Sequence, residues 1–186
     1  MSSSGIDCLL LDGGAAAARD DELLALAAEV RGGADAAAAR RARVWRRQPG
    51  FALAEARHGG YLVGYASGLP LRPSTSWWRG LTTPLPADVT TEHPGRTFAL
   101  TELAVRASWR RQGIGRELHD LLLRDRAEER ATALVPQGAG AAQRAFASWG
   151  WRKAARARGD DAADDPGAPV FDVMLIELPA VHRCYG

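Results

Sequence analysis

The first part of the chain alternates between a short apolar run and a stretch of helical periodicity. The apolar run 6–11 predicts a strand, because a Gly-Gly pair follows it directly. Apolar residues then recur at every third or fourth position. This spacing predicts a helix that Asp20 or Asp21 caps and that Gly32 ends.

The pattern next predicts a second helix and a hairpin. The second helix is expected over 36–47, where Asp35 precedes the first turn and can cap it. The apolar runs 51–56 and 61–69 lie on either side of a Gly-Gly pair and predict a β-hairpin. Residues 70–95 carry prolines and glycines without clear periodicity, so we expect a long surface excursion there.

The second half of the chain is more regular. It predicts a helix from about 113 to 129, and strands at 98–105, 131–135, 151–155 and 170–178. A further helix ends at Gly150 and places Phe146 and Trp149 on one face. The acidic segment 160–167 is expected to be a solvated loop. Together these elements predict one α/β domain over residues 1–186.

Charge and composition narrow the classes of partner. The 24 Lys and Arg residues are nearly balanced by 22 Asp and Glu, so the formal net charge is only +2. Arginines alternate with acidic residues through 116–130, which is typical of a solvated helix face rather than a track for phosphates. We therefore expect no nucleic-acid partner.

No segment of the chain has the pattern of a membrane or secretory protein. Apolar stretches stay well short of the roughly 20 residues that a membrane span requires. The N-terminus lacks the basic residues and apolar run of a signal peptide, and the two cysteines rule out a disulfide scaffold. We expect a cytoplasmic protein. The cysteines and four histidines lack the spacing of zinc ligands, so no metal is expected.

The segment 101–116 holds the most informative chemistry. It reads as a strand, a basic turn with Gly113 and Gly115, and the start of a helix. Glycines let a ligand approach the backbone closely, and the first amides of a helix lack internal acceptors. Such a turn suits a pyrophosphate, although an ordinary turn with surface arginines has the same pattern. The Lys of a P-loop and the first-strand position of a dinucleotide fold are both missing.

This segment resembles a known family. Arg110-Arg111-Gln112-Gly113-Ile114-Gly115 is similar to the Arg/Gln-x-x-Gly-x-Gly/Ala signature of the GNAT superfamily of acyl-CoA-dependent N-acetyltransferases, and Glu102-Leu103-Ala104-Val105 is similar to its central strand. The resemblance continues to Ser148-Trp149-Gly150-Trp151 and covers about 97–153 at the level of motifs. It implies a GNAT-type fold, with a mostly antiparallel sheet of about six or seven strands and about four flanking helices.

The resemblance also implies roles for individual residues. The Val105 backbone N–H would stabilise the oxyanion of the thioester. Acetyl-CoA would contact Ala104, Val105, Arg110, Arg111, Gln112, Gly113, Ile114, Gly115, Arg116 and Phe146. Phe146 stands where many members carry a tyrosine that protonates the thiolate, and Phe cannot donate a proton. Tyr61, Tyr65, Tyr185 or solvent would have to replace it.

Glu102 is the candidate general base, because a carboxylate beside the thioester could deprotonate the amine. A structural ion pair with a nearby arginine is the alternative explanation of a charge inside an apolar strand. In residues 70–97, which we interpret as a candidate substrate lid, Trp77 and Trp78 could wall the acceptor or simply anchor the loop. His93 is a weaker candidate for contact with the acceptor.

We therefore expect an N-acetyltransferase that moves an acetyl group from acetyl-CoA to a primary amine by direct attack, without a covalent enzyme intermediate. A small-molecule acceptor is favoured. The alternatives are a non-catalytic acyl-CoA binding module and an acetyltransferase of protein N-termini or lysines. The resemblance is also compatible with a homodimer.

Overall fold

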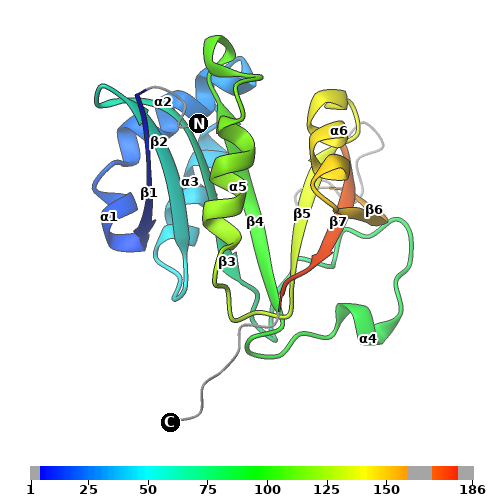
Figure 1. Ribbon diagram of the computed structural model, residues 1–186. Coiled ribbons are helices and arrows are strands. Elements are labelled where there is room, and N and C mark those ends of the chain that lie inside the picture. The colour runs from blue at the N-terminus through cyan, green and yellow to red at the C-terminus, as the bar shows by residue number, and fades with distance from the viewer. Residues whose placement is uncertain (1–4, 159–168, 180–186) are drawn as a thin grey trace. The chain divides into compact units, whose positions relative to one another are not determined.

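The computed structural model describes residues 5–158 and 169–179 (Figure 1). Within these residues, strands and helices follow in the order β1 Ile6–Asp12, α1 Gly13–Ala17, α2 Asp20–Arg31, α3 Ala36–Arg46, β2 Ala52–His58, β3 Tyr61–Pro70, α4 Ala87–Thr90, β4 Thr97–Val105, α5 Ile114–Leu123, β5 Arg130–Pro136, α6 Gly140–Ser148, β6 Arg152–Arg158 and β7 Val170–Glu177. A 3₁₀ turn, Ala107–Trp109, lies between β4 and α5.

The strands form a mostly antiparallel seven-stranded sheet in the order β1-β2-β3-β4-β5-β7-β6. This confirms the predicted fold class and the number of strands. The described residues contain six helices rather than about four, because α1 and α4 are short additions of 5 and 4 residues. The chain divides into two compact units, Met1–Leu69 with Leu100–Arg124, and Pro70–Ala99 with Asp125–Gly186.

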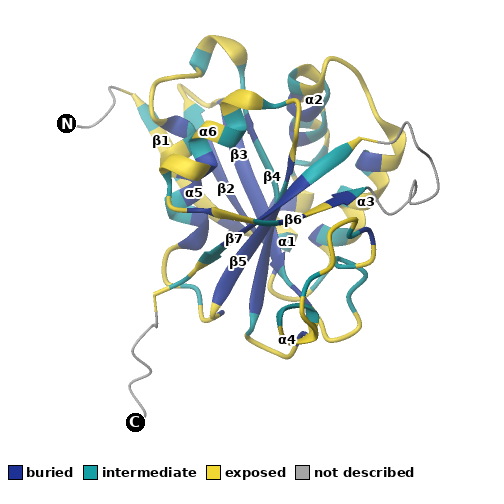
Figure 2. Cartoon of the chain, turned by 90° about the vertical axis from the view of Figure 1, so that its right-hand side faces the viewer, coloured by how far each residue is buried: buried dark blue, intermediate teal, exposed yellow. Residues whose placement is uncertain are grey.

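In the first unit, helices lie on both faces of the strands. Helix α5 lies on one face, and α1, α2 and α3 lie on the other (Figure 2). The core on the α1–α3 face includes Leu23 and Leu26 of α2 together with Leu53, Tyr65 and Ala104 of the strands. Because this apolar surface is buried, the face of β4 that carries Ala104 is turned toward α1–α3.

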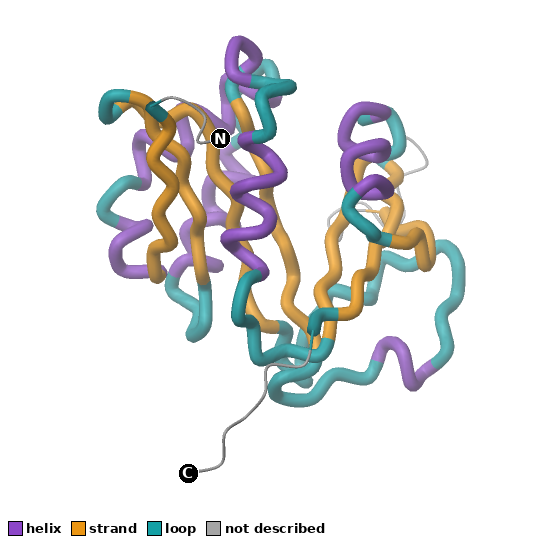
Figure 3. Tube along the Cα trace, in the orientation of Figure 1, coloured by secondary structure: helices purple, strands orange, loops and turns teal. Residues whose placement is uncertain are grey.

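The second unit is built on β5, β7 and β6. The pairs β5–β7 and β7–β6 are antiparallel, and α6 contacts β5. The excursion after β3 is drawn mostly as loop with the short helix α4 (Figure 3). It adds a short segment to β6 through a bridge between Leu81 and Ala157, and Arg158 N–H donates to the Gly80 carbonyl at 2.8 Å.

Two details of the predicted helices are wrong. Helix α5 ends at Leu123 rather than near 129, because Arg124 is extended and Asp125 adopts a left-handed conformation with φ 56°. Asp20 lies in the first turn of α2 rather than at its cap, which is Arg19. The predicted cap Asp35 is confirmed, since its carboxylate accepts from the Ala38 amide at 2.9 Å.

The predicted loop 160–167 and the candidate donor Tyr185 lie outside the described residues. Across the ranges 5–158 and 169–179, none of the helices has the length and apolar character that crossing a membrane would require.

Candidate active site

The turn between β4 and α5 is open on its outer side. Gly113 is the N-cap residue of α5 and has a left-handed backbone with φ 85°. A Cβ atom built on Gly113 would meet nothing within 4 Å. Arg111 is also left-handed, with φ 62°, which is uncommon for a residue other than glycine. The chain thus bends sharply here and leaves open space beside Gly113, the residue that precedes the first turn of α5.

The backbone amides at the start of α5 face this space. The first hydrogen bond of the helix runs from the Glu117 amide to the Gly113 carbonyl at 3.0 Å. The preceding amides of Ile114 and Gly115 therefore have no acceptor within the helix. The Ile114 side chain is buried. The turn offers mainly backbone N–H groups, together with the positive end of the helix dipole.

Three polar side chains in and just after the turn are engaged with the protein. Arg110 Nε donates to the Val105 carbonyl at 2.9 Å, and the Gln112 amide donates to the Ser108 carbonyl at 3.2 Å. Arg116 Nε contacts Asp120 one helical turn later, at 2.7 Å. These contacts stabilise the local backbone. Arg110 and Arg116 therefore support the turn, and its main hydrogen-bond donors are backbone amides.

The end of β4 carries an amide that points away from β3. Arg106 N–H donates to the Val63 carbonyl of β3 at 2.9 Å. Successive residues of a strand point their amides to opposite sides, so the Val105 N–H faces away from β3. Gly64 lets β3 approach closely, because a Cβ there would lie 2.9 Å from the Ala104 carbonyl oxygen. An alanine at this position would disturb the end of β4.

Glu102 lies in a polar cluster on the α1–α3 face of β4. Its carboxylate forms an ion pair with Arg31, the last residue of α2, and the two side chains are 18% and 39% exposed. Arg46 of α3 lies near enough for its charge and that of Glu102 to interact. Burial nevertheless lowers the pKa of Arg46, whose guanidinium forms an ion pair with Asp20. The Arg31 guanidinium therefore compensates the charge of Glu102 in this structure.

Tyr65 of β3 belongs to the same cluster. The residue is buried, and its hydroxyl oxygen has no hydrogen-bond partner within the described residues. Burial, and then the neighbouring charge of Glu102, raise the pKa of Tyr65. The hydroxyl is thus a protonated donor beside a carboxylate, and a shift of Glu102 toward it would satisfy both groups.

Comparison with known proteins decides the family. The model of the acetyltransferase (GNAT) family matches residues 19–151, which is well over half of the chain. The chain belongs to the GNAT acetyltransferase family. The match includes β4, the Gly113 turn and α5, so the resemblance carried by the Arg110–Gly115 signature is confirmed. No curated protein sequence matches the chain.

Solved GNAT structures share the fold at low sequence identity. The ribosomal-protein-S18-alanine N-acetyltransferase of Escherichia coli is 14% identical, with 97% of this chain and 99% of that chain covered and a TM-score of 0.65. A GNAT family acetyltransferase from Elizabethkingia anophelis with acetyl-CoA bound is 13% identical, with 95% and 100% covered and a TM-score of 0.62. NAA60 of Arabidopsis thaliana, in complex with a bisubstrate analogue, is 10% identical, with 94% and 99% covered and a TM-score of 0.67.

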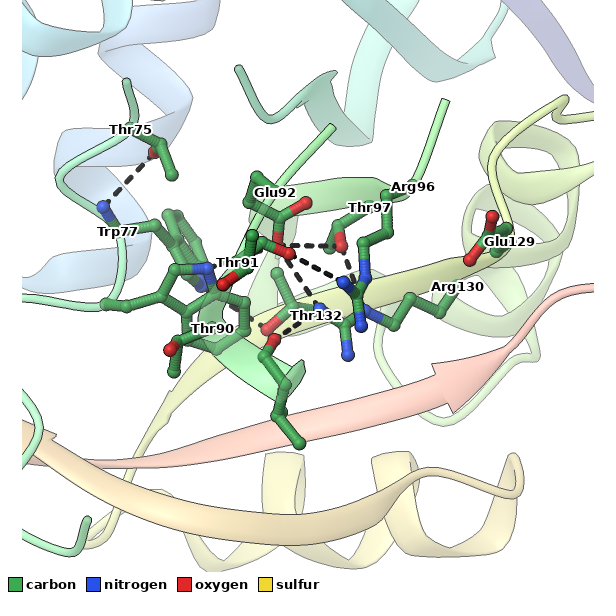
Figure 4. Close-up of polar contacts among 12 residues, drawn as sticks. Thr75, Trp77, Thr90, Thr91, Glu92, Arg96, Thr97, Glu129, Arg130 and Thr132 are labelled. Atoms are coloured by element: carbon green, nitrogen blue, oxygen red, sulfur yellow. Dashed lines mark hydrogen bonds and ion pairs between the residues drawn. The ribbon is translucent and has the colours of Figure 1, made fainter. Parts of the chain in front are cut away.

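The residues predicted to contact the acceptor lie in the second unit, and Figure 4 labels Trp77 among them. Trp77 Nε1 donates to Thr132 of β5 at 3.3 Å, and Trp78 Nε1 donates to Glu92 at 3.1 Å. Both indoles thus anchor the excursion to a buried polar cluster. The ring of the exposed His93 lies 3.2 Å from the neighbouring Pro94 carbonyl and 3.8 Å from Glu129.

That buried cluster was not foreseen from the sequence. Glu92 accepts from Thr97 at 2.9 Å and from Arg130 at 3.2 Å, and Arg130 Nε donates to Thr97 at 2.9 Å. The sequence gives no sign of this cluster, because Glu92 and Arg130 are 38 positions apart.

Phe146 of α6 is buried against Trp149 and Trp151, with ring centroids 5.5 and 5.1 Å away.

Across the described ranges, no group of three or more His, Cys, Asp or Glu side chains is placed to hold one ion.

Proposed function

We propose that this GNAT protein transfers the acetyl group of acetyl-CoA to the primary amine of a small molecule. The observation that carries the proposal is the open turn at Gly113, where helix amides face empty space directly after β4. A pyrophosphate is an anion that such amides and the helix dipole bind. A carboxylate or a larger side chain at Gly113 would occupy the same space.

The residues of the first unit supply the remaining steps. The amides of Ile114 and Gly115 would hold the pyrophosphate, and the strand edge at Ala104 and Val105 would hold the pantetheine arm. The Val105 N–H would donate to the thioester carbonyl oxygen as negative charge develops there. This amide points away from β3, because the next amide, that of Arg106, donates to the Val63 carbonyl of β3.

Glu102 would act as the general base. The acceptor arrives as an ammonium ion and gives one proton to Glu102, directly or through water. Its nitrogen then forms a bond to the carbonyl carbon, the carbon–sulfur bond breaks and the electron pair leaves on sulfur. The newly bonded nitrogen releases its second proton to solvent, which leaves a neutral amide. The thiolate takes a proton from solvent, which is feasible because a thiol has a pKa of about 8.5.

Direct transfer is favoured over a cysteine-bound intermediate. Cys8 is the free cysteine of the described residues, and it lies on β1. Burial and the nearby Glu117 raise the pKa of Cys8 to about 11, so the thiol is a poor nucleophile at neutral pH. The amine itself is therefore the attacking group.

Two measurements test the proposal. Calorimetric titration of acetyl-CoA into the full chain should give a micromolar dissociation constant, and a panel of amines should release free thiol from acetyl-CoA. Binding without thiol release for any amine or peptide would instead indicate an acyl-CoA binding module. Release only with peptides would indicate a protein acetyltransferase.

A further inference from the structure

The ion pair between Glu102 and Arg31 offers two opposite charges to a ligand. Glu102 comes from the same strand as Val105, and Arg31 comes from the end of α2, 71 positions away. The two side chains are 18% and 39% exposed, so solvent reaches both. A ligand that replaces this contact without leaving a charge unpaired must itself carry an anion and a cation.

We propose that Glu102 and Arg31 together bind an acceptor that carries an ammonium and a carboxylate on neighbouring carbon atoms, which is a free α-amino acid. This inference rests on the acetyltransferase function proposed above. The guanidinium of Arg31 binds the acceptor carboxylate, since its planar donors match a carboxylate in two parallel hydrogen bonds. Glu102 accepts from the acceptor ammonium and so lies next to the proton that must leave.

The surroundings of Arg31 allow the exchange of partners. Arg31 ends α2, and the following Gly32 is left-handed with φ 80°. A Cβ built on Gly32 or Gly33 would meet nothing within 4 Å, so the space beyond the helix end is open. The Arg31 side chain is 39% exposed, and neither glycine carries a side chain that would hinder its movement from Glu102 to a ligand.

Tyr65 supports the same exchange from the buried side. Its hydroxyl is buried and lies near enough to Glu102 for the two groups to interact. When the acceptor carboxylate draws Arg31 away, the Tyr65 hydroxyl can donate to the Glu102 carboxylate in its place. Tyr65 is thus a positioning residue. It keeps the Glu102 carboxylate in place while that carboxylate binds the acceptor ammonium.

The selectivity that follows is specific. An amine without a carboxylate leaves Arg31 on Glu102, where it competes with the acceptor ammonium. The N-terminus of a peptide likewise has an amide where the free amino acid has a carboxylate. Both should be poorer acceptors than the amino acid of the same side chain.

The test compares kcat/KM for matched acceptors, measured by thiol release with the full chain and saturating acetyl-CoA. The acceptors are a panel of α-amino acids, each beside its primary amide and its decarboxylated amine. We expect the best amino acid to exceed its amide by about tenfold or more, and Arg31→Gln to bring this ratio close to one. Arg31→Lys keeps the charge and should recover part of the ratio. Arg43→Gln removes an exposed arginine that pairs with Asp20, and should leave the ratio unchanged.

Each other outcome is decisive. Equal kcat/KM for acids and amides, or a preference for peptides, would overturn the amino-acid acceptor while leaving the acetyltransferase function intact. An equal loss for acid and amide in Arg31→Gln would mean that Arg31 only supports the fold. If acetyl-CoA binds and no amine, amino acid or peptide reacts, both this inference and the proposed function fail.

Discussion

Arg130 and Glu92 form a buried ion pair that ties the excursion after β3 to strand β5. Arg130 Nη2 lies 3.2 Å from Glu92 Oε1, and the two side chains are 8% and 0% exposed. Thr97 bridges the pair by bonding both partners (Figure 4). The second oxygen, Glu92 Oε2, has no partner within the described residues. The carboxylate therefore depends on Arg130 and its neighbours for compensation of its charge.

Arg130→Met should destabilise the protein by about 3–5 kcal/mol, because it leaves the Glu92 charge buried without its partner. The double variant Arg130→Met with Glu92→Leu should regain much of this loss. The free energy of unfolding in urea measures both. Arg152 pairs with Glu177 at 3.8 Å in an exposed position, so Arg152→Met is the control and should cost less than about 1 kcal/mol. Similar losses in both single variants would contradict the dependence on burial.

Gly80→Ala should loosen the excursion from β6. A Cβ at Gly80 would lie 2.1 Å from the Arg158 carbonyl oxygen, which is far inside van der Waals contact. We expect a loss of about 1–3 kcal/mol in the free energy of unfolding and faster amide hydrogen exchange at Arg158. Gly138→Ala in the same unit meets nothing within 4 Å and should change neither. Unaltered exchange in Gly80→Ala would mean that the segment is not held at this point.

Gly113→Glu should abolish acetyl-CoA binding, since it places a side chain and a negative charge in front of the α5 amides. Gly113→Ala separates charge from conformation and should weaken binding less. Gly95 has a similar φ of 80° and equally open space, so Gly95→Glu introduces the same charge and strain elsewhere. Calorimetry should give an unchanged dissociation constant for that control. An unchanged constant for Gly113→Glu would refute the placement of the pyrophosphate.

Glu102→Gln should lower kcat by about 100-fold while leaving the dissociation constant of acetyl-CoA within about twofold. The amide keeps the shape of the side chain but accepts no proton from the amine. Glu29, near the end of α2, forms an ion pair with Arg106 and is 48% exposed. Glu29→Gln is therefore a matched control, and we expect little change in its kcat. Normal turnover of Glu102→Gln across the pH range would remove Glu102 from the mechanism.

The stability of the protein should fall in mild acid because of His119. Burial lowers the pKa of His119. This effect outweighs the neighbouring Asp120 carboxylate, which lies 2.8 Å from His119 Nδ1 and acts to raise the pKa. The unfolded chain then binds a proton more readily than the folded one, so this contribution is complete above about pH 6.5 and is lost below it. His119→Gln should flatten the dependence of the unfolding free energy on pH in that range. His93→Gln, at an exposed position, should leave it as in the wild type.

The sequence predicted the regular elements well, because apolar alternation and helical spacing report directly on burial. It failed at the end of α5, where Asp125 is left-handed. A residue other than glycine gives no compositional sign of that conformation. The docking of the excursion on β6 was also missed. The contact between Gly80 and Arg158 joins segments that are far apart in the chain and have no common motif.

The site was predictable to the extent that it consists of backbone. Glycine spacing and the strand before it indicated the turn at Gly113, and the geometry of that turn follows from local conformation. The surroundings of Glu102 were not predictable in the same way. An arginine partner was one alternative, but nothing in the sequence points to Arg31 or to the buried hydroxyl of Tyr65.

The ion pair that joins β6 and β7 has a consequence for self-modification. Lys153 is the chain's single lysine, and its ammonium lies 2.7 Å from Asp172, which also accepts from Gln137 at 2.9 Å. This ion pair holds the amine against β7. An acetyltransferase with this composition presents other copies of itself with almost no side-chain amine to acetylate. The mass of the chain should therefore stay constant during incubation with acetyl-CoA.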